Sequence, residues 1–149
     1  MNHPKPLQAS LLASPDDVET QFYEALQQGD LARLMAVWAD DDEVVCVHPG
    51  GPRLIGSGAI RGSFEAMFAK GGVPAQPEQV HRLQSLGVAV HHLVERVTLP
   101  PGNETRFAWV LVTNVYLNTA QGWRMAAHHA SPGMAARPEP ATEWPSTLH

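Results

Sequence analysis

The sequence predicts an α+β domain in which helices pack on one face of a curved antiparallel sheet. Over residues 15–38 and about 59–70 the apolar residues recur with the spacing of an amphipathic helix, and from Gln79 onward they recur with a period of two. Helices that come first in the chain and strands that come last are typical of this class. A length of 149 residues favours a single domain with a substantial core.

Two helices are predicted at the start of the domain. The first begins at Ser14-Pro15-Asp16-Asp17, where a serine N-cap precedes a proline at the first helical position and two acids in the first turn. Gly29 ends this helix, and Asp30 caps the next one. The apolar residues follow helical spacing in both: Val18, Phe22, Ala25 and Leu26 in the first, Leu31, Leu34, Met35 and Trp38 in the second.

Short strands, a third helix and long strands make up the rest of the domain. Short strands are predicted over 43–48 and 53–55, and a helix over about 59–70. Three long strands follow, over 79–99 with a bend at Gly87, over 105–118 and over 123–130. We assign residues 1–13 to an N-terminal extension, 14–133 to the domain and 134–149 to a proline-rich tail, in which Trp144 is a candidate for packing on a neighbouring subunit.

The long strands are apolar on both of their faces. Residues 88–94 and 107–112 carry apolar side chains at odd and even positions alike, whereas a sheet with one face in water alternates apolar and polar residues. No predicted helix is left to cover the second face. We therefore expect a homodimer in which the partner subunit covers the convex face of the sheet.

Charge and composition argue against several classes of partner. The net charge is −5 and no basic cluster is present, which argues against nucleic-acid binding. No stretch approaches the roughly 20 apolar residues of a membrane span, and the first residues lack the pattern of a secretory signal. Cys46 is the single cysteine and is expected to be a buried apolar residue. A cytoplasmic protein is the simplest interpretation.

Four short motifs carry a resemblance to a known family. They are Val37-Trp38 followed by Asp41-Asp42, then Cys46-Val47-His48-Pro49-Gly50, then Thr113-Asn114-Val115-Tyr116, and last Gly122-Trp123-Arg124-Met125 with His128-His129-Ala130-Ser131-Pro132. Together with the order of the elements, they resemble the SnoaL-like subgroup of the superfamily of nuclear transport factor two and ketosteroid isomerase, over residues 15–133. The resemblance implies a cone-shaped, cystatin-like fold with three helices on the concave side of the sheet, a dimer, and a pocket inside the cone.

The catalytic groups of ketosteroid isomerases have no clear match in this sequence. Those enzymes resemble one another in a pocket aspartate base with a tyrosine and a second acid as oxyanion donors. Tyr116 is a candidate donor here, but the long strands contain no aspartate, and Glu95 is their only clear interior carboxylate. The resemblance therefore indicates the fold and the pocket rather than the reaction.

The final hairpin places its polar residues by parity. Residues that oppose each other in an antiparallel pair share a face. A loop of two or four residues around Ala120-Gln121 puts Asn114 on the same face as His129, and a loop of odd length pairs it with His128. The sequence Thr-Ala-Gln-Gly favours the even loop because Gly122 tolerates a positive φ beside a tight turn. We therefore predict that His129 faces the cavity.

His48, Asn114 and His129 are the predicted catalytic residues. An amide and two imidazoles suit a ligand carbonyl or hydroxyl, because the amide both donates and accepts hydrogen bonds and imidazole transfers protons near neutral pH. The alternative is structural: these side chains hydrogen-bond each other and hold the hairpin in register. The predicted ligand-binding residues are Trp38, Arg53, Tyr116, His128 and Trp109, with Arg61 a further candidate for meeting an anionic ligand at the cavity mouth.

No metal or cofactor is predicted. The pairs His91-His92 and His128-His129 each offer a single ligand to any one site, because adjacent strand residues point to opposite faces. We expect a dimeric protein that binds a small hydrophobic ligand bearing a carbonyl or hydroxyl group. If it is an enzyme, cofactor-independent isomerisation, dehydration or cyclisation fits best. The alternative is an association module that oligomerises and binds no ligand.

Overall fold

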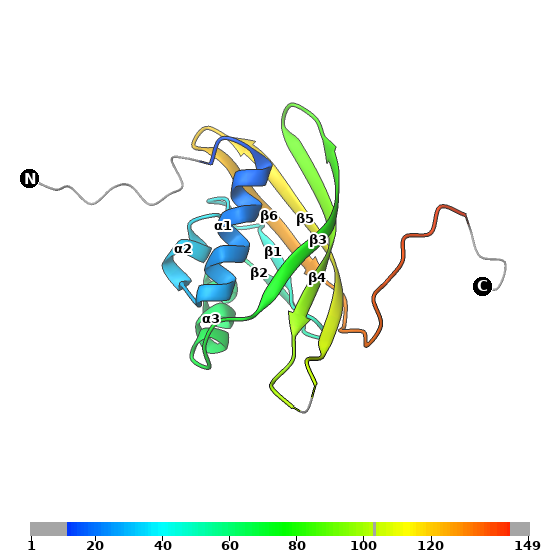
Figure 1. Cartoon of the computed structure of the whole chain (residues 1–149). Coiled ribbons are helices and arrows are strands. Elements are labelled where there is room, and N and C mark those ends of the chain that lie inside the picture. Colours follow the sequence, from blue (N-terminus) through cyan, green and yellow to red (C-terminus); the bar gives the residue numbers. More distant parts are fainter. Residues whose placement is uncertain (1–11, 103, 144–149) are drawn as a thin grey trace, which may run out of the picture.

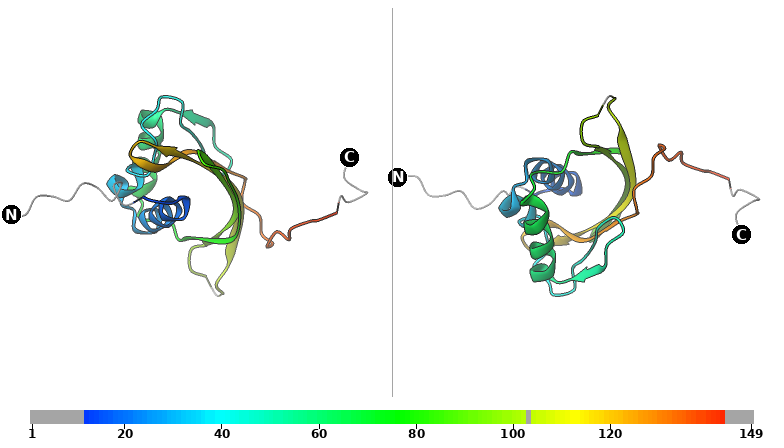
Figure 2. Two further views of the ribbon diagram at one scale, coloured as in Figure 1. Left: turned by 90° about the horizontal axis from the view of Figure 1, so that it is seen from above. Right: turned by 90° about the horizontal axis from the view of Figure 1, so that it is seen from below.

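Three helices lie against the concave side of a curved six-stranded sheet (Figures 1 and 2). The structure is a computed structural model that describes residues 12–102 and 104–143. The predicted α+β class with helices on one face of the sheet is confirmed. The helices are α1 (Pro15–Gln28), α2 (Leu31–Met35) and α3 (Ser57–Phe68), and the strands are β1 (Val45–Val47), β2 (Arg53–Ile55), β3 (Ala75–Gln84), β4 (Val88–Thr98), β5 (Phe107–Thr119) and β6 (Gly122–Ala130).

The first two helices form the expected pair, although the second is shorter than its pattern suggests. The Ser14 hydroxyl accepts a hydrogen bond from the Asp17 amide at 3.1 Å, and Gly29 ends α1 with a φ of 68°. After Met35 the chain leaves the helix, because backbone bonds draw it onto β6: the Met125 amide donates to the Val37 carbonyl at 2.7 Å. This contact takes Trp38 out of α2 and places it beside the sheet.

The sheet has the order β2-β1-β6-β5-β4-β3, and all pairs are antiparallel except β1 with β6. The single strand predicted over 79–99 is two strands, since the chain reverses at residues 85–87 and β3 pairs with β4. The Ser85 amide donates to the Val88 carbonyl at 2.8 Å and closes the turn. Gly87 therefore belongs to a hairpin turn rather than to a bend within one strand. The alternation of side chains continues on both sides of this turn, so the sequence pattern did not reveal that the chain reverses there.

The core fills the space between the helices and the concave face of the sheet. The fully buried residues from the helices include Phe22, Leu34, Ile60 and Phe64, and those from the sheet include Leu93, Val112 and Met125. On β5, side chains at even positions from 110 to 116 are buried, and those at odd positions are half-buried on the convex face. The core therefore lies inside the cone.

The chain after β6 continues along the sheet. Met134 and Trp109 exchange backbone hydrogen bonds of 2.8 Å, and the Arg137 guanidinium lies over the Trp109 ring at 4.8 Å. Trp144 and residues 1–11, for which extensions were predicted, lie outside the described residues. Across the part of the chain that the structure describes, no helix has the length and apolarity required to cross a membrane.

Candidate functional site

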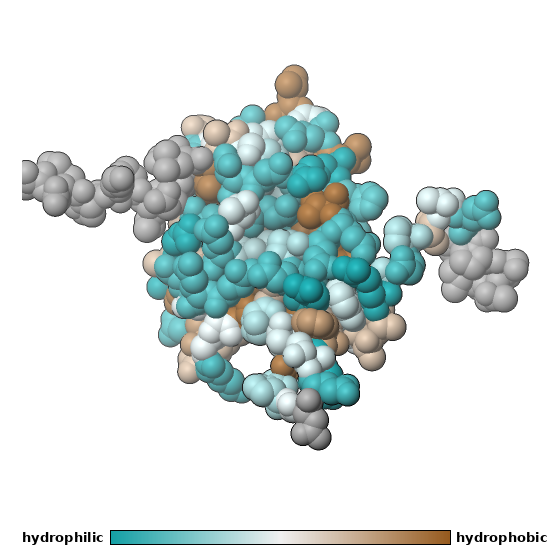
Figure 3. Space-filling view, viewed as in Figure 1, coloured by the Kyte–Doolittle hydropathy of each residue, from teal (hydrophilic) through white to brown (hydrophobic). Residues whose placement is uncertain are grey.

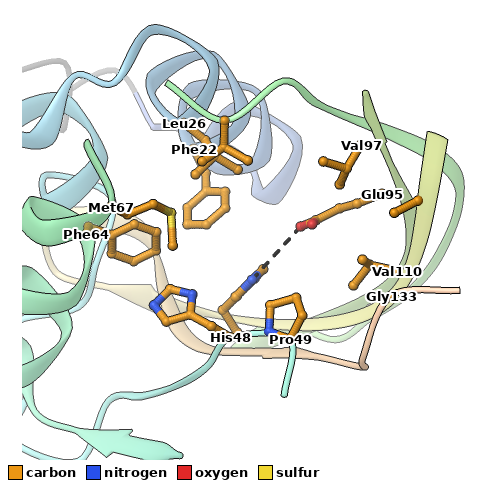
Figure 4. Close-up of a pocket in the computed structure, with 13 residues that line it drawn as sticks. Phe22, Leu26, His48, Pro49, Phe64, Met67, Glu95, Val97, Val110 and Gly133 are labelled. Atoms are coloured by element: carbon orange, nitrogen blue, oxygen red, sulfur yellow. Dashed lines mark ion pairs between the residues drawn. The ribbon is translucent and has the colours of Figure 1, made fainter. Parts of the chain in front are cut away.

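A pocket of about 240 Å³ opens between the helices and the concave face of the sheet. Figure 4 shows aromatic and aliphatic side chains from α1 and α3 facing Glu95, Val97 and Val110 across it. Among the described residues, the polar side chains of the lining are those of His48, Glu95 and His128. The remaining lining is Phe22, Leu26, Pro49, Phe64, Met67, Val73, Val97, Ala108, Val110 and Gly133.

Four buried side chains, two of which line the pocket, form one hydrogen-bonded chain. The Tyr23 hydroxyl of α1 donates to Glu95 Oε2 at 2.8 Å, and Asn114 Nδ2 donates to that hydroxyl at 3.4 Å. His128 Nδ1 lies 2.6 Å from Asn114 Oδ1. An amide oxygen only accepts hydrogen bonds, so Nδ1 carries the ring hydrogen and Nε2 holds a lone pair. His128 Nε2 lies 4.0 Å from Glu95 Oε2, so the two ends of the hydrogen-bonded chain meet at the pocket (Figure 4).

Burial sets the protonation of both groups that end this chain. It raises the pKa of the Glu95 carboxyl to about 7, against which the hydrogen bond from Tyr23 acts in the lowering direction. It lowers the pKa of His128 to about 3, with smaller contributions from His48 and His129. Near neutral pH, His128 is therefore a neutral imidazole and Glu95 exchanges between its acid and its carboxylate. Titratable groups with such shifts in a cleft are typical of functional sites.

His48 lines the same pocket at the end of β1. Ser63 Oγ donates to the Ile60 carbonyl at 2.7 Å, so its hydrogen is in use, and the contact of 2.9 Å from His48 Nε2 to Ser63 Oγ is one that His48 donates. The His48 ring also meets the Phe64 ring edge-on at 4.9 Å. Burial lowers the pKa of His48, which favours its neutral form. A proline and a glycine follow His48, and the chain turns away from the strand there.

His129 lies on the opposite face of the sheet, so the prediction that it shares a face with Asn114 is wrong. The loop is even, as predicted, since Thr119 pairs with Gly122, and Tyr116 pairs with Met125 in the same register. Between Met125 and Ala127 the strand then gains one residue against β5, which is a β-bulge. The bulge reverses the parity, and His128 rather than His129 pairs with Asn114.

The other predicted ligand-binding residues lie outside this pocket, except His128. Tyr116 is buried on the concave face, where its hydroxyl donates to Glu19 Oε1 at 3.4 Å. Trp38 is buried beside β6, and Trp109 is half-buried under Arg137. Arg53 is exposed on β2. Asn114 stands behind His128 and does not line the pocket.

Two residues of the site were not among the predicted set. Glu95 lines the pocket, and its signal was present, because it is a lone carboxylate on the buried parity of an apolar strand. Tyr23 follows Phe22 in α1 and lies next to the apolar stripe that defined the helix, so its hydroxyl gave no pattern of its own. Only the pairing of α1 with the sheet brings Tyr23 to Glu95.

A second cluster of polar side chains lies between α1 and β4. Single ligand atoms of Asp16, Glu19 and His91 lie within 4.8 Å of one another. Each already has a protein partner: His91 Nδ1 is 3.1 Å from Glu19 Oε1, and Arg82 Nε is 2.8 Å from Asp16 Oδ1. We interpret this cluster as a structural link that fastens α1 to the sheet.

The helices and the curved sheet, with a pocket between them, define a cone-shaped α+β protein. The SnoaL-like domain family matches residues 16–136, and the chain belongs to this family. The family assignment made from the four motifs is therefore confirmed. No curated protein matches the chain.

Solved structures with the same fold include proteins of quite different names. A Thiobacillus denitrificans protein, provisionally named as a calcium/calmodulin-dependent protein kinase type II association domain, is 37% identical with a TM-score of 0.74, over 81% of this chain and 96% of that chain. A Streptomyces avermitilis protein of the NTF2-like family, provisionally named as a dehydratase, is 30% identical with a TM-score of 0.70, over 80% and 94%. A ketosteroid isomerase-like protein from Erwinia carotovora is 16% identical with a TM-score of 0.65, over 87% and 98%, and shares the fold alone.

Proposed function

We propose that this protein binds a small, mostly apolar ligand in the cone and transfers protons on it without a cofactor. The observation that carries the proposal is the pairing of Glu95 with His128 at the end of an otherwise apolar pocket. A carboxyl whose pKa is about 7 can take up or return a proton near neutral pH, and the neutral imidazole beside it can accept a hydrogen bond from the ligand. The name of the Streptomyces avermitilis relative, a dehydratase, is consistent with such chemistry.

Glu95 is the better general base of the two, because its pKa of about 7 lies close to neutral pH, whereas the pKa of His128 is lowered to about 3. Asn114 holds the Nδ1–H of His128, which fixes the tautomer and directs the Nε2 lone pair toward Glu95. A carbon or oxygen acid of the ligand that reaches the Glu95 carboxylate would lose its proton there, and the Glu95 carboxyl so formed could return the proton to a carbonyl or hydroxyl oxygen, while His128 Nε2 accepts a hydrogen bond from the ligand. Isomerisation, dehydration and cyclisation each use these two proton transfers: in dehydration the protonated hydroxyl leaves as water when its C–O bond breaks, and in cyclisation the deprotonated carbon forms a bond to the carbonyl carbon. We place the ligand carbonyl or hydroxyl at this end of the pocket.

Native mass spectrometry of freshly purified protein, followed by variants, tests the proposal. A ligand that co-purifies with the wild type and is absent from His128→Ala would support it. His129→Ala is the matched control, because His129 is a histidine on the opposite, exposed side of the same strand. The proposal fails if both variants retain the ligand equally, or if the ligand depends on His129.

The second candidate is an association module, which the name of the Thiobacillus denitrificans relative favours. We propose a homodimer through the convex face, in either case. Support comes from apolar side chains at odd positions of β5 and from the exposed end of the β3–β4 hairpin, where Leu83 is 76% and Leu86 is 94% exposed. Figure 3 shows apolar surface at that tip. Register places Leu83 opposite Val90 and Val90 opposite Val115, so the tip and the convex face form one apolar surface.

The two candidates differ in what the pocket is for. If the protein is only an association module, a folded variant in which Glu95 or His128 is replaced should keep the oligomeric state of the wild type and show no loss of ligand, because none is bound. A ligand-binding protein would lose its ligand. The cytoplasm remains the predicted location of either protein.

A further inference from the structure

When Glu95 is ionised, the hydrogen-bond directions around the pocket leave it with acceptors and no side-chain donors among the residues that line it. Tyr23 gives its hydrogen to Glu95, and Asn114 gives one to Tyr23. His128 gives its Nδ1–H to Asn114, and His48 gives its Nε2–H to Ser63. When Glu95 is ionised, what faces the pocket is a carboxylate oxygen and the lone pair of His128 Nε2.

These two acceptors lie 4.0 Å apart, close enough for one group to contact both. A hydroxyl has one hydrogen and can satisfy one of them, whereas an ammonium has three hydrogens on a single nitrogen. Unpaired buried acceptors cost free energy, so a ligand that donates to both gains more than one that donates to one.

Charge favours the same group. None of the residues that line the pocket, all within the described part of the chain, is a lysine or an arginine. The titratable groups that contact Glu95 are Tyr23 from α1 and His128 from β6, His48 lines the same pocket, and the charge of Glu95 also acts on Cys46 from β1; all four are neutral near pH 7. An ionised Glu95 therefore has no cationic side chain beside it among the described residues that line the pocket, and a carboxylate or phosphate on the ligand would meet it with like charge. The rings of Phe22 and Phe64 form part of the wall, and aromatic faces also attract cations.

We propose that the polar end of the ligand is a protonated amine, held between Glu95 and His128 Nε2, on a molecule whose apolar body fills the rest of the pocket. This inference rests on the proposed ligand pocket and adds the charge of the ligand that the pocket binds. The amine takes the place at this end of the pocket where a carbonyl or hydroxyl was proposed above, and the pocket excludes ligands whose polar end is an anion.

The test compares three probes of matched size, benzylamine, benzyl alcohol and benzoate, by calorimetric titration of the full chain at pH 8. Benzylamine should bind about tenfold more tightly than benzyl alcohol, because hydrogen bonds to a charged donor are about twice as strong as neutral ones. Benzoate should bind most weakly. In Glu95→Gln, benzylamine should lose this tenfold advantage over benzyl alcohol. Glu43→Gln removes an exposed carboxylate outside the pocket and should bind all three probes like the wild type.

A pH series on the wild type provides a test that needs no variant. Glu95 must lose its proton to pair with the amine, so benzylamine affinity should rise as the pH increases through about 7, while an alkylammonium stays protonated. Benzyl alcohol affinity should not rise. If benzyl alcohol or benzoate binds as tightly as benzylamine, the amine is wrong and the ligand pocket stands. If none of the three binds, both proposals are wrong.

Discussion

Single residues decide the chemistry of this pocket, and Asn114 is the one on which the orientation of the others depends. Its amide accepts from His128 and donates to Tyr23, and it is fully buried. Replacing it with alanine leaves a buried imidazole N–H without a partner. We expect Asn114→Ala to lower the free energy of unfolding by about 1–3 kcal/mol, measured by urea denaturation. Asn118→Ala is the control, because Asn118 is exposed and bonds only a loop carbonyl, and its effect should be smaller. Equal effects would contradict the assigned network.

The contribution of Glu95 to the free energy of unfolding changes with pH, because the folded and unfolded states bind its proton with different pKa values. Its pKa in the folded protein, about 7, lies above the ordinary value of 4.5, so between these two values the folded state holds a proton that the unfolded state has released. The contribution of Glu95 to stability is therefore present at low pH and is lost as the pH rises to about 7. The pKa of His128 is lowered, and its contribution runs in the opposite direction, so wild-type stability alone does not isolate Glu95.

The difference between Glu95→Gln and wild type isolates the carboxyl. The two proteins should show a constant offset in unfolding free energy below about pH 4.5. Above pH 4.5, the unfolding free energy of the variant should rise relative to that of the wild type, by up to about 3 kcal/mol as the pH approaches 8, since one pKa unit corresponds to about 1.4 kcal/mol. Chemical denaturation at several pH values between 4.5 and 8 measures this gain. A difference that does not change with pH would show that Glu95 titrates normally.

At the scale of the elements, the turn between β5 and β6 sets the register of the hairpin that carries Asn114 and His128. Gly122 has a φ of 101°, and a Cβ at this position would lie 2.7 Å from the Leu12 carbonyl oxygen. That carbonyl accepts the Trp123 amide, so it is held in place. Gly122→Ala should therefore destabilise the protein by about 1–3 kcal/mol, measured as a loss in the urea midpoint.

Gly62 is the matched control for this prediction. It lies inside α3, and an added Cβ there meets no atom within 4 Å. Gly62→Ala should stabilise the protein by about 0.5–1 kcal/mol, because alanine loses less conformational freedom in a helix. If both substitutions shift the midpoint in the same direction, the strain at Gly122 is not the cause.

The elements also show how far the sequence could lead. Caps at Ser14, Gly29 and Asp30 determine three helix ends locally, so these could be predicted. Period-two alternation reveals the strand region, but it did not reveal the turn that separates β3 from β4. The length of the β5–β6 loop followed from Gly122. The β-bulge near Ala126 could not be predicted, because Met-Ala-Ala-His carries no residue that favours or forbids an extra position. That one residue decides which histidine enters the cavity. Tyr23 was missed for a related reason, since its partner lies 72 positions away in the sequence.

At the scale of the whole molecule, the convex face of the sheet is the surface on which we expect a partner subunit. Leu111, Thr113 and Val115 lie half-buried there, and the apolar end of the β3–β4 hairpin extends the same surface. A stable interface with an apolar centre would cover it. Light scattering at micromolar concentration should therefore report twice the chain mass of 16.2 kDa.

Val115→Asp places a charge at the centre of this face and tests the interface itself. Burying an unpaired carboxylate costs free energy that two symmetric copies both incur, so the dissociation constant should rise by about thirtyfold or more. Ile55→Asp is the control, because Ile55 is an exposed apolar residue on β2, at the edge of the sheet, and its replacement should leave the mass unchanged. Since Val115 points away from the cavity, the monomeric variant should still unfold cooperatively and bind ligand. A wild-type mass of 16.2 kDa, or a Val115→Asp protein that remains dimeric, would show that this face is not the interface.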